Sequence, residues 1–313
     1  MVIMHIVWLI VGCFLLVKAA EYAVRSISNV GRVMRMSEFI ISFIVVGIIS
    51  TFPEFFVSVV AAVKGFPTLA FGTLIGSNVA DLTVVIALMV LFGGTIRVGT
   101  KALRYDFFYL VLAAVPILLA LDGMLSRLDG AVLVLLCIVF FYHMITQSYH
   151  FRKVEQGIRK RLLWDVILFT ISVIVLFFSA NMIVKYAELL ALDWGIRKIF
   201  IGLVLIALGT TLPELTFGIK ALKKGLGDLA LGDVLGNVII DATFVLGVVA
   251  LIAPIQVSLV IVTSVGFFMV LGMFILITII ERGHHVLTKK HAWWLLGIYI
   301  MYLVVTVTIS HLI

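Results

Sequence analysis

The sequence is poor in charged residues. Only 12% of its 313 residues are Asp, Glu, Lys or Arg, whereas 64% are hydrophobic, and the mean hydropathy is +1.29. A soluble globular domain carries about 25% charged residues, so this composition excludes an ordinary soluble protein. Uncharged stretches of about 17 to 25 residues, each long enough to cross ~30 Å of hydrocarbon, recur along the whole chain and leave no room for a soluble domain. The sequence therefore predicts a multi-pass membrane protein in contact with the lipid bilayer.

Cysteines and nucleotide-binding motifs are equally scarce. The two cysteines, Cys13 and Cys137, lie in apolar stretches, where we expect packing residues rather than a disulfide or a metal site. The sequence contains no G-x-x-x-x-G-K-[ST] loop, so it gives no sign of ATP-driven transport. The net charge of +7 does not indicate a nucleic-acid partner, because the basic residues fall in short loops between apolar stretches. We expect no tightly bound cofactor, and the sequence predicts no particular oligomeric state.

Charged or turn-rich breaks divide the chain into ten predicted transmembrane helices. These spans lie near 2–22, 38–63, 68–93, 105–121, 129–149, 162–187, 199–222, 228–251, 257–281 and 291–311. The predicted fold class is thus an all-α integral membrane protein. We expect a first five-helix unit at 1–149, a basic linker at 150–161 and a second five-helix unit at 162–313.

The basic residues collect on one side of this arrangement. Seventeen Lys and Arg residues fall on the side that contains the linker 150–161, and five fall on the other side. Since cytoplasmic loops carry an excess of Lys and Arg, the linker is predicted to be cytoplasmic and both termini to lie outside.

The two halves of the chain repeat one another. A shift of 160 residues aligns 50–54 (STFPE) with 210–214 (TTLPE) without a gap. The same shift superimposes two glycines and an acid, which are Gly72 on Gly232, Gly76 on Gly236 and Asp81 on Asp241. Because each copy holds an odd number of spans, the second copy must enter the membrane from the opposite side. Inverted repeats of this kind are typical of secondary transporters, with the substrate near the midplane.

Each repeat places a proline and a glutamate in the middle of its second span. Pro53 and Pro213 lack an N–H and leave the carbonyl four residues earlier without its helical partner. Such a group is costly in hydrocarbon unless it lines a cavity or meets an ion. Hydroxyls and a carboxylate flank each proline, and they are Ser50, Thr51 and Glu54 in the first copy and Thr210, Thr211 and Glu214 in the second. Hard oxygens suit calcium and sodium, and the absence of thiolate and imidazole argues against zinc or copper.

The third span of each repeat adds a second acid. Asp81 and Asp241 each follow the glutamate of their own repeat by 27 residues, in the middle of an apolar run where carboxylates are expensive and usually functional. The stripes Gly72/Gly76 and Gly232/Gly236 are predicted to let this helix approach its neighbour closely.

Segments 47–81 and 207–241 resemble the paired α-repeats of prokaryotic sodium/calcium exchangers, within the cation/calcium exchanger superfamily. The match is close in 209–214 (GTTLPE) and from Gly232 to Asp241. The resemblance implies a prokaryotic cell-membrane antiporter that exchanges calcium for sodium by alternating access, with Glu54 and Glu214 as the calcium ligands. It further implies that calcium and sodium are bound in part by oxygens of Asp241, Ser50, Thr51, Thr210, Thr211 and Ser77 and by the backbone carbonyls near Gly47 and Ala207. We add Asp81 and Asn237 to these predicted metal ligands.

The sequence departs from the family pattern at four positions. Ile49 and Phe52 replace smaller residues and predict a bulkier first half-site, and Asn237 stands where a serine is typical. Asp81 replaces an asparagine, so four carboxylates would face one cavity. Neither one calcium nor three sodium ions neutralises four negative charges, which favours a proton on Asp81 or Asp241 in at least one transport state. Proton-coupled exchange of calcium or another divalent cation therefore stays open.

Two further readings are weaker. Tyr105-Asp106 and 225–228 (GLGD) match the short YD and GxGD motifs of intramembrane aspartyl proteases. Both aspartates, however, fall at the first residues of their spans, and this reading leaves the repeated Glu54 and Glu214 unexplained, so we expect a transporter and not an enzyme. A passive cation channel is the other alternative, and the duplicated broken helices favour alternating access over it.

Overall fold

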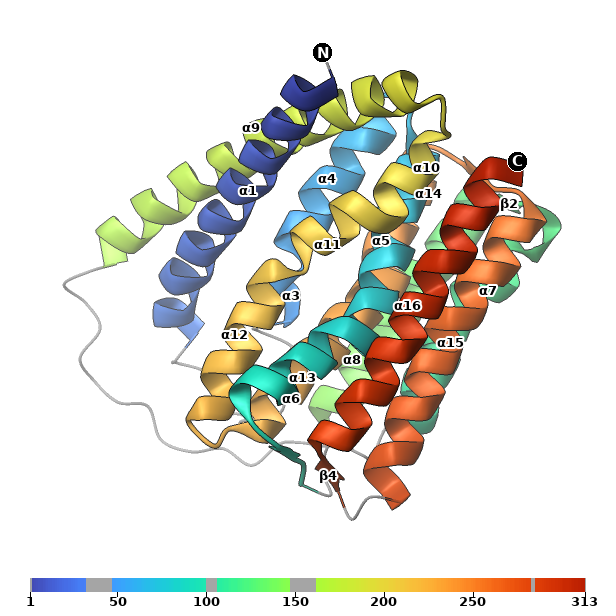
Figure 1. Cartoon of the computed structure of the whole chain (residues 1–313). Coiled ribbons are helices and arrows are strands. Elements are labelled where there is room, and N and C mark those ends of the chain that lie inside the picture. The colour runs from blue at the N-terminus through green and yellow to red at the C-terminus, as the bar shows by residue number, and fades with distance from the viewer. Residues whose placement is uncertain (1, 32–46, 100–105, 147–161, 283–284, 313) are drawn as a thin grey trace.

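The computed structural model describes residues 2–31, 47–99, 106–146, 162–282 and 285–312, and these are mainly helical (Figure 1). The first half contains α1 (Val2–Gly31), α3 (Gly47–Ser50), α4 (Phe52–Val63), α5 (Pro67–Ala80), the π-helical turn η2 (Asp81–Val85), α6 (Ile86–Gly93), α7 (Asp106–Leu119), the 3-10 turn η4 (Ala120–Asp122) and α8 (Arg127–Thr146). The second half contains α9 (Leu162–Trp194), α10 (Lys198–Ile201), the π-helical turn η5 (Gly202–Ile206), α11 (Ala207–Thr210), α12 (Leu212–Lys223), α13 (Gly227–Ile240), the π-helical turn η6 (Asp241–Val245), α14 (Leu246–Ile252), α15 (Leu259–Arg282) and α16 (Lys289–Leu312). Four two-residue strands complete the description, namely β1 (Ile96–Arg97), β2 (Met124–Leu125), β3 (Ile255–Gln256) and β4 (Val286–Leu287).

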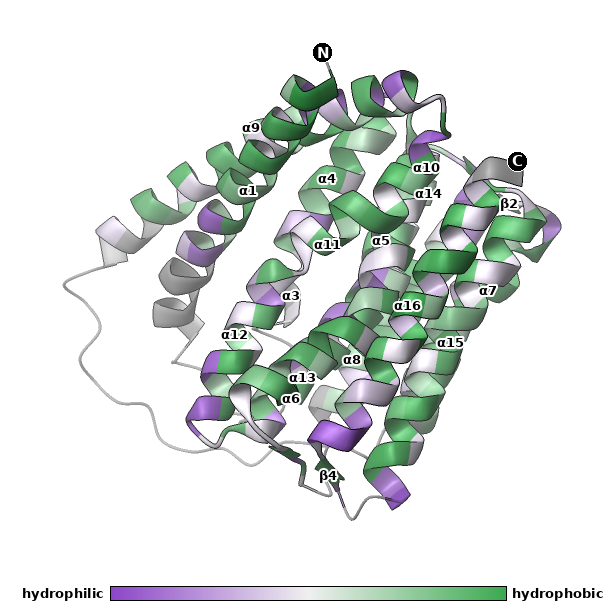
Figure 2. Cartoon of the chain, in the orientation of Figure 1, coloured by the Kyte–Doolittle hydropathy of each residue, from purple (hydrophilic) through white to green (hydrophobic). Residues whose placement is uncertain are grey.

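These helices have the length and composition of membrane spans. Among the described residues, eight helices are long and apolar enough to cross a bilayer, and Phe52–Val63 and Phe107–Asp122 are shorter apolar helices. Figure 2 shows hydrophobic residues along the bodies of the helices and hydrophilic residues near their ends, as at the lower end of α12. The predicted linker 150–161 lies outside the described residues.

The predicted ends of two spans were wrong. Helix α1 continues to Gly31 instead of ending at 22, and α9 continues to Trp194 instead of 187. The additional turns of α9 carry Glu188, which pairs with Lys198 at 2.7 Å, and Asp193, whose Oδ2 lies 2.5 Å from Nδ1 of His5. Because Glu188 and Asp193 are paired in this way, α9 continues through them instead of ending before them.

The distribution of polarity is inverted relative to a soluble protein. Large apolar side chains are exposed on the outer helices, for example Ile3 of α1 and Phe178 of α9, whereas Glu54, Asp81 and Asp241 are fully buried. Exposed apolar surface of this extent fits a hydrocarbon surrounding, and buried carboxylates mark a polar interior. Both cysteines are buried and free.

The helices of the two halves correspond residue by residue. Adding 160 to the bounds of α3, α4, α5 and η2 gives the bounds of α11, α12, α13 and η6. The strands pair between the halves, with β1 antiparallel to β4 and β2 antiparallel to β3. Strands β1 and β3 follow corresponding helices, α6 and α14. They nevertheless lie at opposite ends of the molecule, because β4 lies at the lower end and β2 at the upper end in Figure 1.

Glycines allow the central helices to touch through their backbones. A Cβ at Gly72 would lie 2.3 Å from the carbonyl oxygen of Ile199, and one at Gly76 would lie 2.4 Å from that of Leu203. These distances are below any real contact, so α5 packs against α10 and η5 only because both residues are glycine. The predicted close approach of this stripe is confirmed.

We expect Gly76→Ala to destabilise the protein strongly. The added methyl group meets the backbone of Leu203, which has no rotamer to move away, so the cost should be at least about 2 kcal/mol. Thermal unfolding in detergent measures this cost. The matched control is Gly297→Ala on α16, where a Cβ meets nothing within 4 Å. Equal midpoints for the two variants would contradict the packing described here.

Candidate functional site

Each repeat interrupts its proline-bearing helix at a threonine. Thr51 separates α3 from α4, and Thr211 separates α11 from α12. Pro53 and Pro213 occupy the first turn of the helix that follows, where the missing N–H costs nothing because that turn has no intrahelical acceptor. The break therefore brings hydroxyls, carbonyls and the following glutamate together at one level of the fold.

The second acid of each repeat begins a π-helical turn. Asp81 is the first residue of η2 and Asp241 the first residue of η6. The wider turn leaves carbonyls without their usual partner, and the hydroxyls of Thr83 and Thr243 donate to the carbonyls of Val79 and Ile239. π-helical turns inside α-helices occur frequently at functional sites.

Four predicted carboxylates converge in the interior. Glu54, Asp81, Glu214 and Asp241 are all fully buried. Glu214 interacts electrostatically with Glu54 and Asp81, and Asp241 interacts with the same two residues. In the part of the chain that the structure describes, no Lys, Arg or His forms an ion pair with any of them.

These carboxylates have several oxygens without a hydrogen-bond partner among the described residues. Both oxygens of Glu54 and of Glu214 are unpartnered, as are Oδ1 of Asp81 and Oδ1 of Asp241. A buried, unpaired carboxylate costs several kcal/mol, so the group as a whole requires positive charge. The remaining lone pairs are therefore suited to binding cations.

In the first repeat, hydroxyls join the helix break to α13. The Thr51 hydroxyl lies 2.6 Å from the Gly47 carbonyl and 2.7 Å from Oδ1 of Asn237. Nδ2 of Asn237 donates to Oδ2 of Asp81 at 2.8 Å, which orients the amide. The Thr51 proton can serve only one of its two acceptors. When it points to Asn237, the Gly47 carbonyl still accepts the Thr51 backbone N–H at 3.1 Å, and its second lone pair is left for the Ser50 hydroxyl, also at 3.1 Å, or for a cation.

In the second repeat, the corresponding groups bond more locally. The Ala207 carbonyl accepts the Thr211 backbone N–H at 3.1 Å and the Thr210 hydroxyl at 3.2 Å. The Thr210 side chain also lies close to Glu54 of the other repeat. Ser77 of α5 donates to Oδ2 of Asp241 at 3.1 Å, a second link between the repeats.

The structure thus brings the predicted site residues to one region between the repeats. The acidic side chains alone do not form a complete metal site. The described residues contain no group of three or more His, Cys, Asp or Glu side chains arranged to hold a metal ion. A cation held here would therefore need hydroxyl and carbonyl oxygens in addition to carboxylates, and calcium takes six to eight oxygen ligands of mixed kinds.

One acid of the site was missed at the sequence level. Asp233 of α13 is fully buried, accepts the Ser50 hydroxyl at 2.9 Å, and has an unpartnered Oδ2. It interacts electrostatically with Glu54, Asp81 and Glu214. The available signal was a carboxylate in the middle of an apolar span. The repeat alignment hid it, because position 73 of the first copy is Thr.

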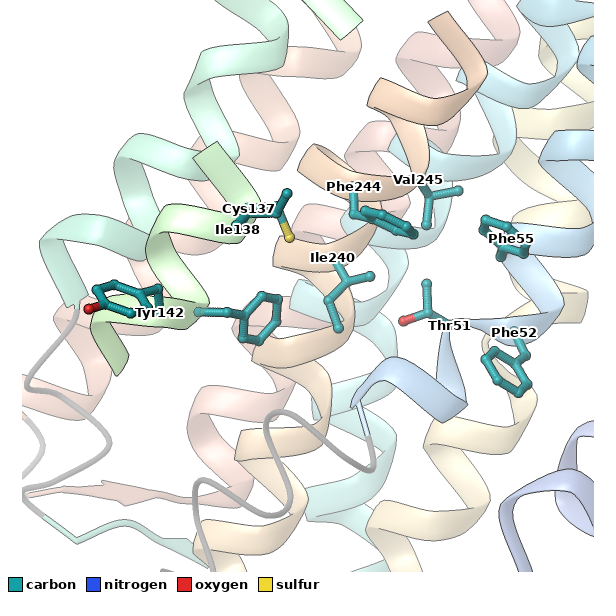
Figure 3. Close-up of a pocket in the computed structure, with 10 residues that line it drawn as sticks. Thr51, Phe52, Phe55, Cys137, Ile138, Tyr142, Ile240, Phe244 and Val245 are labelled. Carbon is teal, nitrogen blue, oxygen red and sulfur yellow. The ribbon is translucent and has the colours of Figure 1, made fainter. Parts of the chain in front are cut away.

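The ring of Phe52 packs against two other aromatic rings. Its centroid lies 6.2 Å from that of Phe56 and 6.5 Å from that of Phe169 of α9. The break borders an apolar pocket of about 570 Å³ between α4, α8 and the α13–η6 helix, with Thr51, Phe52, Phe55, Phe244 and Cys137 among its lining (Figure 3). Apart from Thr51, this lining is almost entirely apolar and does not suit a cation, so the pocket and the candidate ion site share only the threonine of the helix break. The side chain of Ile49 lies outside the described residues.

The protease motif receives no support from Asp228. This aspartate lies in the first turn of α13, and its Oδ1 accepts the backbone N–H of Gly99 at 2.7 Å. It therefore anchors the loop after β1. The side chain of Asp106 lies outside the described residues.

Paired helix breaks, π turns and buried acids in a membrane-spanning helical bundle define a transporter of cations. The sequence matches the family model described as sodium/calcium exchanger protein over residues 4–146 and 164–308. The chain belongs to the sodium/calcium exchanger family.

Known relatives agree with this assignment. The chain is 31% identical over 262 residues to the inner membrane protein YrbG of Escherichia coli, with 79% of each chain covered. It is 26% identical over 308 residues to the sodium/calcium exchanger MaX1 of Methanosarcina acetivorans, covering 82% of this chain and 86% of the relative. Its fold is similar to that of the sodium-calcium exchanger NCX_Mj in crystals soaked with sodium and strontium. That structure has a TM-score of 0.72 at 25% identity, with 97% of this chain and 99% of the other covered.

Proposed function

We propose that this protein is a secondary-active antiporter that exchanges calcium for sodium by alternating access. The observation that carries the proposal is the pair Glu54 and Glu214. These two carboxylates come from equivalent positions of the two repeats, interact with each other, and keep all four oxygens unpartnered and buried. Family membership supports the same conclusion.

Glu54 and Glu214 are proposed as the primary calcium ligands. Two carboxylates match the double charge of the ion, and carbonyl and hydroxyl oxygens supply the rest of a hard oxygen shell. The candidates for this shell are the remaining predicted residues, namely Ser50, Thr51, Thr210, Thr211, Ser77 and Asn237, with the carbonyls of Gly47 and Ala207. Asp81 and Asp241 flank the pair and are proposed to bind sodium.

We further propose that ten spans form two inverted five-helix repeats, at 1–149 and 162–313. The residue-by-residue correspondence of α3 to η2 with α11 to η6 supports this, as do the equivalent strands β1 and β3 at opposite ends of the molecule. The N-terminal end of α1 and the C-terminal end of α16 lie on the same side in Figure 1. Ten spans require this, because an even number of crossings returns the chain to the side where it began. The excess of Lys and Arg favours a cytoplasmic linker and external termini.

Calcium uptake into proteoliposomes tests the function. We expect uptake with an outward sodium gradient and little uptake without one, because the exchange of sodium drives calcium against its gradient. A proton gradient in place of sodium separates the coupling ions. Uptake driven by protons alone would move the protein to proton-coupled exchange, and equal uptake under all conditions would indicate a channel.

A further inference from the structure

Asp233 breaks the correspondence between the two repeats. Its counterpart in the first repeat is Thr73, whose hydroxyl only donates to the Leu69 carbonyl of its own helix at 3.0 Å. Asp233 instead crosses to the other repeat, where its Oδ1 accepts the Ser50 hydroxyl at 2.9 Å. The site therefore has a fifth carboxylate, and it lies on the side of the α3–α4 break.

The surroundings of Asp233 are those of a ligand and not of a structural ion pair. The side chain is fully buried and Oδ2 has no partner among the described residues. Its electrostatic neighbours Glu54, Asp81 and Glu214 are all acidic. A structural role would be served equally well by a neutral residue accepting from Ser50, without the cost of burying a charge beside other acids.

We infer that Asp233 is an additional sodium ligand, which forms one subsite together with the Ser50 hydroxyl and the Gly47 carbonyl. This inference rests on the proposed function, since it assigns a further ligand to the same transport site.

The hydrogen bond from Ser50 prepares this subsite. Ser50 Oγ lies 2.9 Å from Asp233 Oδ1 and 3.1 Å from the Gly47 carbonyl. When its proton is donated to Asp233, the lone pairs of Oγ are turned away from the carboxylate. If the Thr51 hydroxyl donates to Asn237 at the same time, the Gly47 carbonyl accepts only the Thr51 backbone N–H and has one lone pair for a cation. One carboxylate with two neutral oxygens offers a single negative charge, which matches sodium, whereas the two glutamates match calcium.

Ion-dependent stability of the purified full-length protein tests the inference directly. We would record thermal unfolding midpoints of wild type and Asp233→Asn over a series of sodium chloride concentrations, with choline chloride holding the ionic strength constant. The asparagine still accepts from Ser50 but carries no charge. We expect its half-saturating sodium concentration to rise at least about tenfold. Without sodium, the variant should be at least as stable as wild type, because one buried like charge is gone.

Two comparisons separate a ligand from a positioning residue. Asp228→Asn makes the same chemical change on the same helix outside the site and should keep the wild-type sodium dependence. Ser50→Ala keeps the charge and removes one neutral ligand, so it should weaken sodium binding less than Asp233→Asn does. Ser50→Ala also carries the test if Asp233→Asn does not fold, and unaltered sodium binding in it would then overturn the inference.

An unchanged sodium dependence in Asp233→Asn would overturn the inference. So would a defect confined to Asp233→Ala, since that result would assign Asp233 to positioning Ser50. Neither result bears on transport, because the assay needs no vesicles. Failure of wild type to exchange calcium for sodium in proteoliposomes would instead overturn the proposed function, and the sodium-binding comparison would still decide the role of Asp233.

Discussion

Replacing Glu54 with glutamine is expected to abolish sodium-driven calcium uptake, and replacing Glu214 with glutamine is expected to do the same. Both carboxylates are buried without hydrogen-bond partners among the described residues, so a bound cation would supply their main favourable interaction. Removing one partner of a buried charge pair typically costs about 3 to 5 kcal/mol. A loss of that size weakens calcium binding at least about 100-fold.

Glutamine keeps the shape of the side chain and removes only the charge. Both variants should therefore insert and fold, with monodisperse elution in detergent and an unfolding midpoint without added ions that is no lower than in wild type. The control is Glu21→Gln, which makes the same change at a carboxylate paired with Lys18 at 3.0 Å near the surface of α1. Uptake by this control should match wild type. Residual calcium uptake above about a tenth of wild type in either site variant would contradict the assignment of primary ligands.

Replacing Asp81 with asparagine is expected to flatten the pH dependence of calcium uptake. Oδ2 of Asp81 accepts a hydrogen bond from Asn237, and Oδ1 has no partner among the described residues. The side chain interacts electrostatically with Glu54 and Asp233. With Asp233 included, the site carries five negative charges when fully ionised, more than one calcium or three sodium ions can neutralise. A proton is then expected to make up part of the difference in at least one transport state.

The measurement is initial calcium uptake at a fixed sodium gradient, from about pH 6 to pH 9. In wild type, protons compete with cations for the carboxylates at the acidic end, so uptake should rise with pH. Asp81→Asn has one carboxylate fewer to protonate and should rise less steeply. Asp228→Asn serves as the control, because that aspartate binds the Gly99 backbone outside the site. A profile for Asp81→Asn that overlays wild type would refute a role for Asp81 in proton binding.

The positions of the helices were largely predictable because two strong constraints act on them. Hydrocarbon requires long apolar segments, and the duplication fixes equivalent breaks at Thr51 and Thr211. The end of α9 was not predictable, since its extension depends on tertiary partners such as Lys198 for Glu188. No local pattern in the sequence announces such a partner.

The candidate site residues that could be predicted are those that occur in both copies of the repeat. The acids and hydroxyls that recur at a shift of 160 do converge in the interior. Asp233 was missed because its counterpart is Thr73, and a search for shared residues overlooks what one copy alone possesses. The contacts of Phe52 with Phe56 and Phe169 were not predictable, because sequence gives the size of a side chain and not its direction.

The unequal pair of Asp233 and Thr73 has an energetic consequence for the empty carrier. If two inverted repeats were identical in sequence, a two-fold axis in the membrane plane would relate the inward-open and outward-open states, and their free energies would be equal. One additional carboxylate in only one repeat removes that equality if the two states hydrate Asp233 to different extents, because hydration stabilises its charge. The resting protein should therefore favour the state that hydrates Asp233 better. The cation gradient then acts on two states whose free energies already differ because of a single side chain.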